Sequence, residues 1–173
     1  MRATWHHLGG ITEYLFFGLR GVPASKRYRC VLTYGGDITA LESWEILSQN
    51  KDAVLIDVRT NAEWAYVGVP SLNRDMTPLV GQQWQLFPNM AVDPDFVEKL
   101  SNTLSEMQLG HDAKLCFLCR SGVRSLAAAK AMWERGFKNS YNISGGFEGD
   151  LNKESHRGQK NGWKAENLPW QQG

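Results

Sequence analysis

The chain has 173 residues and a mass of 19.5 kDa, the size of about one domain. Hydrophobic residues make up 42% and charged residues 21%, so the chain is not disordered throughout. The net charge of +1 argues against a nucleic-acid-binding protein, and no apolar stretch approaches the ~20 residues that span a bilayer.

Three regions follow one another: a basic extension at residues 1–36, a domain at 37–150, and a polar tail at 151–173 that should pack on or near the domain. Residues 1–36 carry five cations and one anion. A basic, acid-poor segment can be a mitochondrial transit peptide, but glycine and proline interrupt any long amphipathic helix here. In the tail, His156 and Arg157 are expected to be solvated, with folding over the functional site of the domain as the alternative.

The first half of the domain predicts a helix, a buried strand and a long loop. Thr39 and Glu42 form a capping-box pattern, followed by apolar residues at helical spacing, Leu41, Trp44 and Leu47. The apolar run at 53–58 is short and continuous, which is typical of a parallel strand covered on both faces. One helical turn is expected within 60–66, and mostly loop from 67 to 92.

The second half predicts two helices and two strands. Asp93 and Pro94 have the pattern of a helix start, and Gly110 should end this helix, whose buried face is Phe96, Val97, Leu100, Leu104 and Met107. Residues 114–118 predict a second buried strand, 126–133 a helix, and 141–143 a short strand. Strands that alternate with helices indicate an α/β domain with a mainly parallel sheet.

The segment 119–125 joins the second buried strand to the helix that follows it. Cys119 falls at the carboxyl end of that strand, the edge where open α/β sheets bind ligands. The free N–H groups and dipole of the helix start, together with Arg120 and Arg124, should stabilise the thiolate form of Cys119. The segment therefore suits a thiolate that attacks an anionic sulfur donor and then holds the persulfide. An inert buried cysteine, or an anion-binding loop with an incidental cysteine, is the simpler alternative.

Residues 119–125 closely resemble the active-site loop of rhodanese-like sulfurtransferases. Residues 57–60 with Glu63-Trp64 resemble an earlier signature of that family, and Gly145-Gly146-Phe147 a later one. The tail is similar to that of single-domain bacterial members, particularly alphaproteobacterial ones. Many relatives carry a histidine after the first signature, and the corresponding stretch here, residues 67–72, lacks it.

The resemblance implies a three-layer rhodanese-like fold in which a persulfide on Cys119 carries sulfane sulfur from a thiosulfate-like anion to cyanide or a thiol. The loop that would hold the donor and the persulfide consists of Arg120, Ser121, Gly122, Val123, Arg124 and Ser125. Asp57 and Arg59, at the carboxyl edge of the sheet, would support the residues of this loop without contacting the substrate, or would form only a structural salt bridge.

The resemblance implies neither a metal nor an organic cofactor. The expected partners are a small anionic sulfur donor and a thiol or protein acceptor, without nucleic acid or membrane, and the chain would be a monomer or homodimer. Three cysteines are too few for a disulfide framework, so the cytoplasm is the predicted compartment and the mitochondrial matrix the alternative.

Three other interpretations remain open. A Cdc25-like phosphatase or arsenate reductase has five residues between its cysteine and arginine, whereas four separate Cys119 from Arg124. A non-catalytic rhodanese-like binding module would typically lose the cysteine that this chain keeps. Cys116 and Cys119 form a Cys-x-x-Cys pair, but one pair lacks the ligands for zinc, and Cys116 should face the opposite side of the strand. Cys116 is thus expected in the core, with a resolving role as the alternative.

Overall fold

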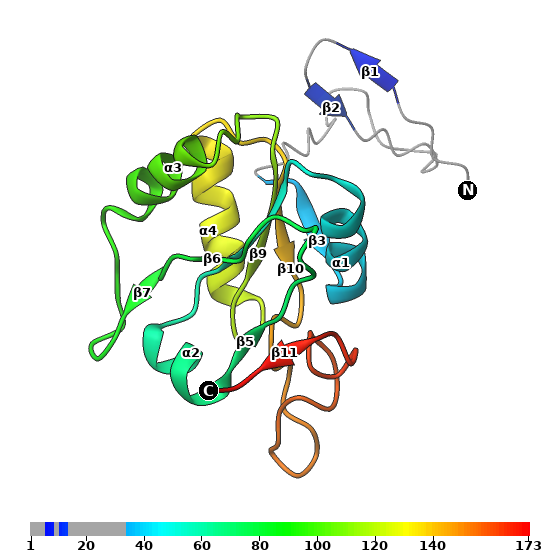
Figure 1. Cartoon of the computed structure of the whole chain (residues 1–173), viewed down its shortest axis with the longest axis vertical. Helices are drawn as coiled ribbons and strands as arrows, with labels where there is room; N and C mark the ends of the chain where they lie inside the picture. Colours follow the sequence, from blue (N-terminus) through cyan, green and yellow to red (C-terminus); the bar gives the residue numbers. More distant parts are fainter. Residues whose placement is uncertain (1–5, 9–10, 14–33) are drawn as a thin grey trace, which may run out of the picture. The chain divides into compact units, whose positions relative to one another are not determined.

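The computed structural model describes residues 6–8, 11–13 and 34–173 of the chain. The chain divides into two compact units, Met1–Thr33 and Tyr34–Gly173. In the first unit, strand β1 (His6–Leu8) pairs antiparallel with β2 (Ile11–Glu13) (Figure 1). Cys30 and most of the basic extension lie outside the described residues, so the extension and its boundary at residue 36 stay predictions.

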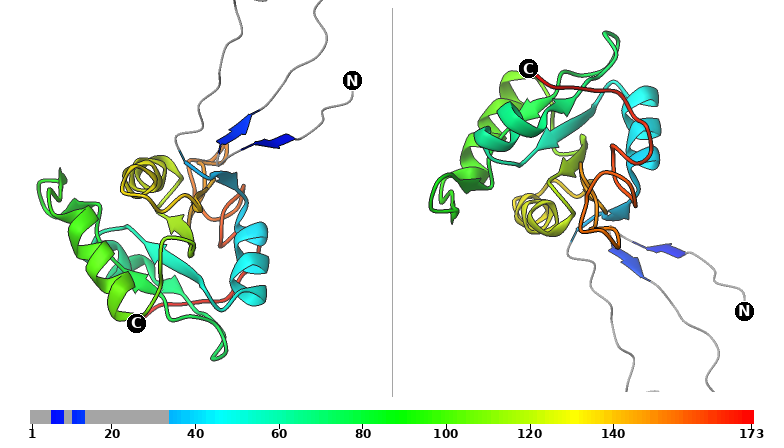
Figure 2. Two further views of the ribbon diagram at one scale, coloured as in Figure 1. Left: turned by 90° about the horizontal axis from the view of Figure 1, so that it is seen from above. Right: turned by 90° about the horizontal axis from the view of Figure 1, so that it is seen from below.

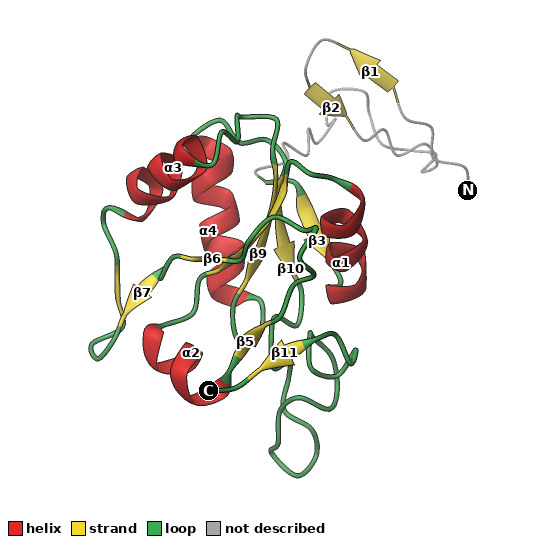
Figure 3. Ribbon diagram, viewed as in Figure 1, coloured by secondary structure: helices red, strands yellow, loops and turns green. Residues whose placement is uncertain are grey.

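A five-stranded parallel sheet forms the centre of the second unit, in the order β3-β10-β9-β4-β6. Its strands are β3 (Gly36–Ile38), β4 (Ala53–Asp57), β6 (Val80–Gly81), β9 (Lys114–Leu118) and β10 (Ser140–Ile143). The helices are α1 (Ala40–Gln49), α2 (Asn61–Val67), α3 (Phe96–Glu106) and α4 (Val123–Glu134) (Figure 3). The predicted α/β class with a mainly parallel sheet is confirmed. In the described part of the chain, none of these helices has the length and apolar character that crossing a membrane requires.

Each face of the sheet carries its own apolar core, because successive side chains of a strand point to opposite faces. Val54 and Ile56 of β4 join the core beneath α3 and α4, whereas Leu55 joins the core on the side of α1. Figure 2 shows α3 and α4 on one face of the sheet and α1 on the other. Trp163 of the tail is buried in this second core. All five residues of β4 are buried, as the continuous apolar run predicted.

Capping boxes fix the starts of two helices. The predicted box of Thr39 and Glu42 begins α1, although Leu41, expected on its buried face, is 47% exposed. A second box, of Thr60 and Glu63, begins α2. This helix is longer than the single turn expected, because both the side-chain and the backbone groups of the box are paired.

Helix α3 is shorter at both ends than predicted. It begins at Phe96 and not at Asp93, because the Asp93 carboxylate accepts the N–H of Asp95 and closes a turn before the helix. It ends at Glu106 and not at Gly110. Gln108 adopts the left-handed conformation, and the N–H of Leu109 donates back to the Leu104 carbonyl, which ends the helix four residues before Gly110.

The segment from 67 to 92 is mostly loop, as predicted, but it holds four short strands. One of them is β6 of the main sheet, and β7 (Gln85–Leu86) forms a hairpin with β8 (Ala91–Val92). The fourth, β5 (Val69–Pro70), pairs antiparallel with β11 (Trp170–Gln171). Strands of two residues give no periodic signal, so only the tertiary structure reveals these pairings.

Candidate active site

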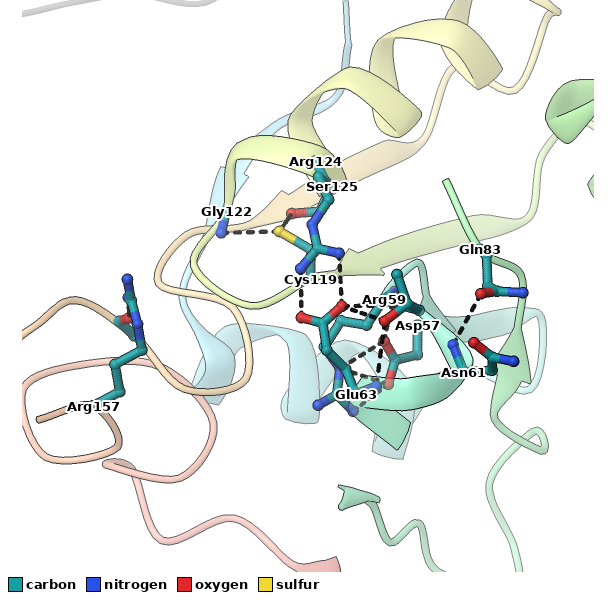
Figure 4. A network of polar contacts seen from close by, with 12 residues as sticks. Asp57, Arg59, Asn61, Glu63, Gln83, Cys119, Gly122, Arg124, Ser125 and Arg157 are labelled. Carbon is teal, nitrogen blue, oxygen red and sulfur yellow. Dashed lines mark hydrogen bonds and ion pairs between the residues drawn. The ribbon is translucent and has the colours of Figure 1, made fainter. Parts of the chain in front are cut away.

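Cys119 directly follows β9 and lies at the carboxyl edge of the sheet, as predicted. Its side chain is buried, and its Sγ accepts two hydrogen bonds of 3.1 Å, from the N–H of Gly122 and the hydroxyl of Ser125 (Figure 4). Helix α4 already begins at Val123, and its N-cap is Gly122, with φ 103 in the left-handed region that favours glycine. The sulfur is therefore held in place by one backbone and one hydroxyl donor.

The other loop residues divide into those that face a cavity and those behind the sulfur. Arg120, Ser121, Val123 and Arg124 line a cavity of about 750 Å³ together with Cys119. Gly122 and Ser125 are buried against Sγ. The structure thus brings the predicted loop residues together around one sulfur atom, and their roles in binding stay predictions.

Arg124, which the sequence suggests as a fixed positive charge near Cys119, is paired with a carboxylate. Its guanidinium donates to both carboxylate oxygens of Glu63, at 2.7 and 2.6 Å. Burial opposes ionisation of Glu63, but hydrogen bonds from Arg124 and Thr60 outweigh it and lower the pKa of this carboxyl from 4.5 to about 2. Glu63 was absent from the predicted site residues, although it belongs to the earlier family signature and has the capping-box spacing from Thr60.

We expect Glu63→Gln to remove an acid-sensitive part of the folding stability. Because the pKa of Glu63 is lower in the folded chain, the ion pair stabilises fully above about pH 4.5 and loses its effect as the pH falls towards 2. The shift corresponds to a contribution of at most about 3 kcal/mol. Urea unfolding should show a larger difference between wild type and variant at pH 7 than at pH 3. Glu98→Gln, at an exposed position, is the control. If the unfolding free energies of wild type and Glu63→Gln differed equally at pH 7 and pH 3, the prediction would be contradicted.

Asp57 and Arg59 form a buried ion pair behind the loop. Nε and Nη2 of Arg59 contact the Asp57 carboxylate at 2.6–3.1 Å, and Nη2 also donates to the Gly68 carbonyl at 2.8 Å. The guanidinium lies 4.0 Å from the ring centroid of Phe147. No hydrogen bond joins this pair to the Cys119 side chain in the described part of the chain. The geometry is that of a structural ion pair that reaches the loop through Phe147, and any catalytic role stays a prediction.

The Gly145-Gly146-Phe147 motif lies directly beneath the cysteine loop. The N–H of Phe147 donates to the Cys119 carbonyl at 2.7 Å, and the N–H of Glu148 donates to the Arg120 carbonyl at 3.0 Å. A side chain on Gly146 would have its Cβ 2.3 Å from the Cys119 carbonyl oxygen. The motif therefore holds the loop backbone, and glycine is required there for close approach.

The cavity is also lined by residues outside the predicted site. Phe87 and Met90 come from the hairpin that joins β7 to β8, and Arg157 comes from the tail. Arg157 takes the alternative position over the site: it is half-buried and donates to the Gly149 carbonyl, whereas His156 is exposed. Long-range folding brings these segments to the cysteine loop, so no local pattern marks them.

Cys116 faces the second core, on the opposite side of β9 from Cys119. Burial raises the pKa of its thiol to about 12, which keeps it protonated and unreactive at neutral pH. This placement agrees with the expected core role of Cys116. Among the described residues, no three His, Cys, Asp or Glu side chains are grouped as a metal site.

The Cys119 side chain accepts from a backbone N–H and a hydroxyl in the loop between a parallel strand and a helix. The protein is therefore an α/β protein with a cysteine loop at the edge of its sheet. The family model that matches the chain, over residues 39–153, is that of the rhodanese-like domain. The chain belongs to this family, which confirms the resemblance predicted from the loop.

The relatives match between 65% and 81% of the chain. A Rickettsia conorii protein named uncharacterized protein RC0915 is 40% identical over 135 residues, 78% of this chain and 96% of its own. A Haemophilus influenzae protein named thiosulfate sulfurtransferase GlpE is 29% identical over 113 residues, 65% of this chain and 85% of its own. The crystal structure of Rv0390 from M. tuberculosis superimposes with a TM-score of 0.71 and 42% identity, covering 81% of this chain and 99% of that chain.

Proposed function

We propose that this protein is a sulfurtransferase whose Cys119 carries sulfane sulfur as a persulfide. The observation that carries the proposal is the pair of hydrogen bonds to Sγ at the floor of an arginine-lined cavity. Family membership and the similarity to a protein named thiosulfate sulfurtransferase support it.

The reaction has two displacement steps, and neither requires an oxidant or a metal. The Cys119 thiolate attacks the outer sulfur of a thiosulfate-like anion, an S–S bond forms, and the donor's own S–S bond breaks so that sulfite leaves with the electron pair. An acceptor then attacks the outer sulfur of the persulfide. Cyanide leaves as thiocyanate, or a thiolate leaves as a persulfide, and the Cys119 thiolate is restored. We propose the cytoplasm as its compartment, from the sequence-based expectation.

The mouth of the cavity supports a thiol or protein acceptor in addition to cyanide. Val123 and Phe87 are 77% and 61% exposed there, and Met90 is 39% exposed. Exposed apolar residues around a reactive group offer burial to a larger partner, whereas cyanide gains nothing from them.

Intact-protein mass spectrometry before and after thiosulfate tests the proposal directly. Wild type should gain one sulfur atom that cyanide removes, and Cys119→Ser should gain none, because it lacks the nucleophile. Cys116→Ala is the matched control, since Cys116 is buried on the other face, and it should gain sulfur like wild type.

Two outcomes would contradict the proposal. The absence of sulfur uptake by wild type would favour a phosphatase or a binding module, and a phosphate ester would then be the next substrate to test. Sulfur uptake by Cys119→Ser would show that another cysteine carries the sulfur.

A further inference from the structure

Three arginines line the cavity at Cys119, but they are not equally available to a ligand. Arg124 is occupied by both carboxylate oxygens of Glu63. Arg120 and Arg157 make no ion pair with a carboxylate in the described part of the chain. The charge of Arg124 is therefore already balanced by Glu63, whereas an anion that enters the cavity finds the charges of Arg120 and Arg157 without such a partner among the described residues.

The backbone of residues 148–149 connects Arg120 to Arg157. The Gly149 N–H donates to the Arg120 carbonyl at 3.2 Å, and the Gly149 carbonyl accepts from Nη1 of Arg157. The Gly158 N–H donates to the Glu148 carbonyl at 2.5 Å, which closes the tail loop that carries Arg157. The half-buried Arg157 side chain is thus anchored before a ligand arrives, so less entropy is lost on binding.

The charges around the cavity favour an anion. Its lining carries three guanidinium groups and two carboxylates, those of Glu63 and Glu148, so it is positive overall. Glu63 is paired with Arg124, and the charge of Glu148 also acts on Lys164 of the tail. A guanidinium that keeps free N–H groups can pair with two oxygens of a sulfonate-like group.

We propose that Arg157, together with Arg120, forms the anion-binding site that brings an anionic reagent to Cys119. Arg157 is then a specificity residue contributed by the tail, beyond the 39–153 segment that matches the family. The arginines by themselves support a site for an anion. That this anion is the sulfur donor rests on the proposed function.

Two alkylating reagents of nearly equal size test the anion site without sulfur chemistry. Iodoacetate carries a charge and iodoacetamide does not, and both react in the same way. Sγ attacks the methylene carbon, an S–C bond forms, the C–I bond breaks, and iodide leaves with the electron pair. The ratio of the two rates at Cys119, followed by peptide mass mapping, therefore reports attraction of an anion.

Arg157→Gln should lower the iodoacetate-to-iodoacetamide ratio about tenfold, the effect of losing one charged hydrogen bond. Arg157→Lys should restore part of the ratio, since it keeps the charge without the planar group. Lys153→Gln, an exposed cation of the same tail loop, should leave the ratio unchanged. A purely structural role of Arg157 would slow both reagents equally, and that result would overturn the proposal.

Thiosulfate then identifies the anion. In Arg157→Gln, kcat/KM for thiosulfate should fall about tenfold, in step with the alkylation ratio. If the alkylation ratio falls but wild type takes up no sulfur, the anion site is supported and the proposed function fails. If wild type takes up sulfur and Arg157→Gln retains both the ratio and kcat/KM, the proposed function is supported and this inference is wrong.

Discussion

Gly146→Ala should slow persulfide formation on Cys119 about 100-fold, because a displacement of about 1 Å in an active site can cost that much. The new Cβ would lie 2.3 Å from the Cys119 carbonyl oxygen and 2.8 Å from the Ser121 nitrogen. Both are backbone atoms, so no side chain can turn aside to make room. The loop must move, and its hydrogen bonds to Phe147 and Glu148 lengthen.

Rapid-quench mass spectrometry with thiosulfate measures this rate. Gly110→Ala is the matched control, because its Cβ would meet no atom within 4 Å. It should react like wild type. If Gly146→Ala reacted at the wild-type rate, the glycine motif would not determine the position of the cysteine loop.

Arg59→Met should lower the free energy of unfolding by about 3–5 kcal/mol, the usual cost of leaving a buried charge without its partner. Arg59 is completely buried, and it supplies every side-chain donor that reaches the Asp57 carboxylate in the described part of the chain. The variant also loses the contact between the guanidinium and Phe147. Because total stabilities are about 5–15 kcal/mol, the effect should be visible in a single urea titration.

A second variant separates the unpaired charge from the loss of packing. Asp57→Leu combined with Arg59→Met removes both charges and should recover most of the stability, because an apolar pair of similar volume avoids the desolvation cost. Lys160→Met, which breaks the exposed pair of Lys160 and Asp150, should cost less than about 1 kcal/mol. If Arg59→Met were as mild as Lys160→Met, the buried pair would contribute little to stability.

Features confined to one stretch of chain could be predicted from the sequence. The apolar runs that predicted β4 and β9 are continuous and short, and the two strands occupy the same residues as these runs. The segment 119–125 joins a strand to a helix without a break, so the position of Cys119 at the sheet edge follows from local order alone. Helix ends were less predictable: α3 begins and ends where turns at Asp93 and Gln108 close, and turn geometry depends on backbone angles that residue types only bias.

The surroundings of Cys119 were decided by the tertiary structure. Glu63, Phe147 and Arg157 come from three distant segments, and only folding brings them to the cysteine loop. The consequence is chemical. Arg124, which the sequence presents as a free cation, is paired with Glu63. Arg157, for which the sequence favours a solvated position over one at the site, lines the cavity. By itself the sequence determined the cysteine loop and the family, because these depend on residues that are neighbours in the chain. The charges around that loop depend on contacts between distant residues, and these exist only once the sheet has formed.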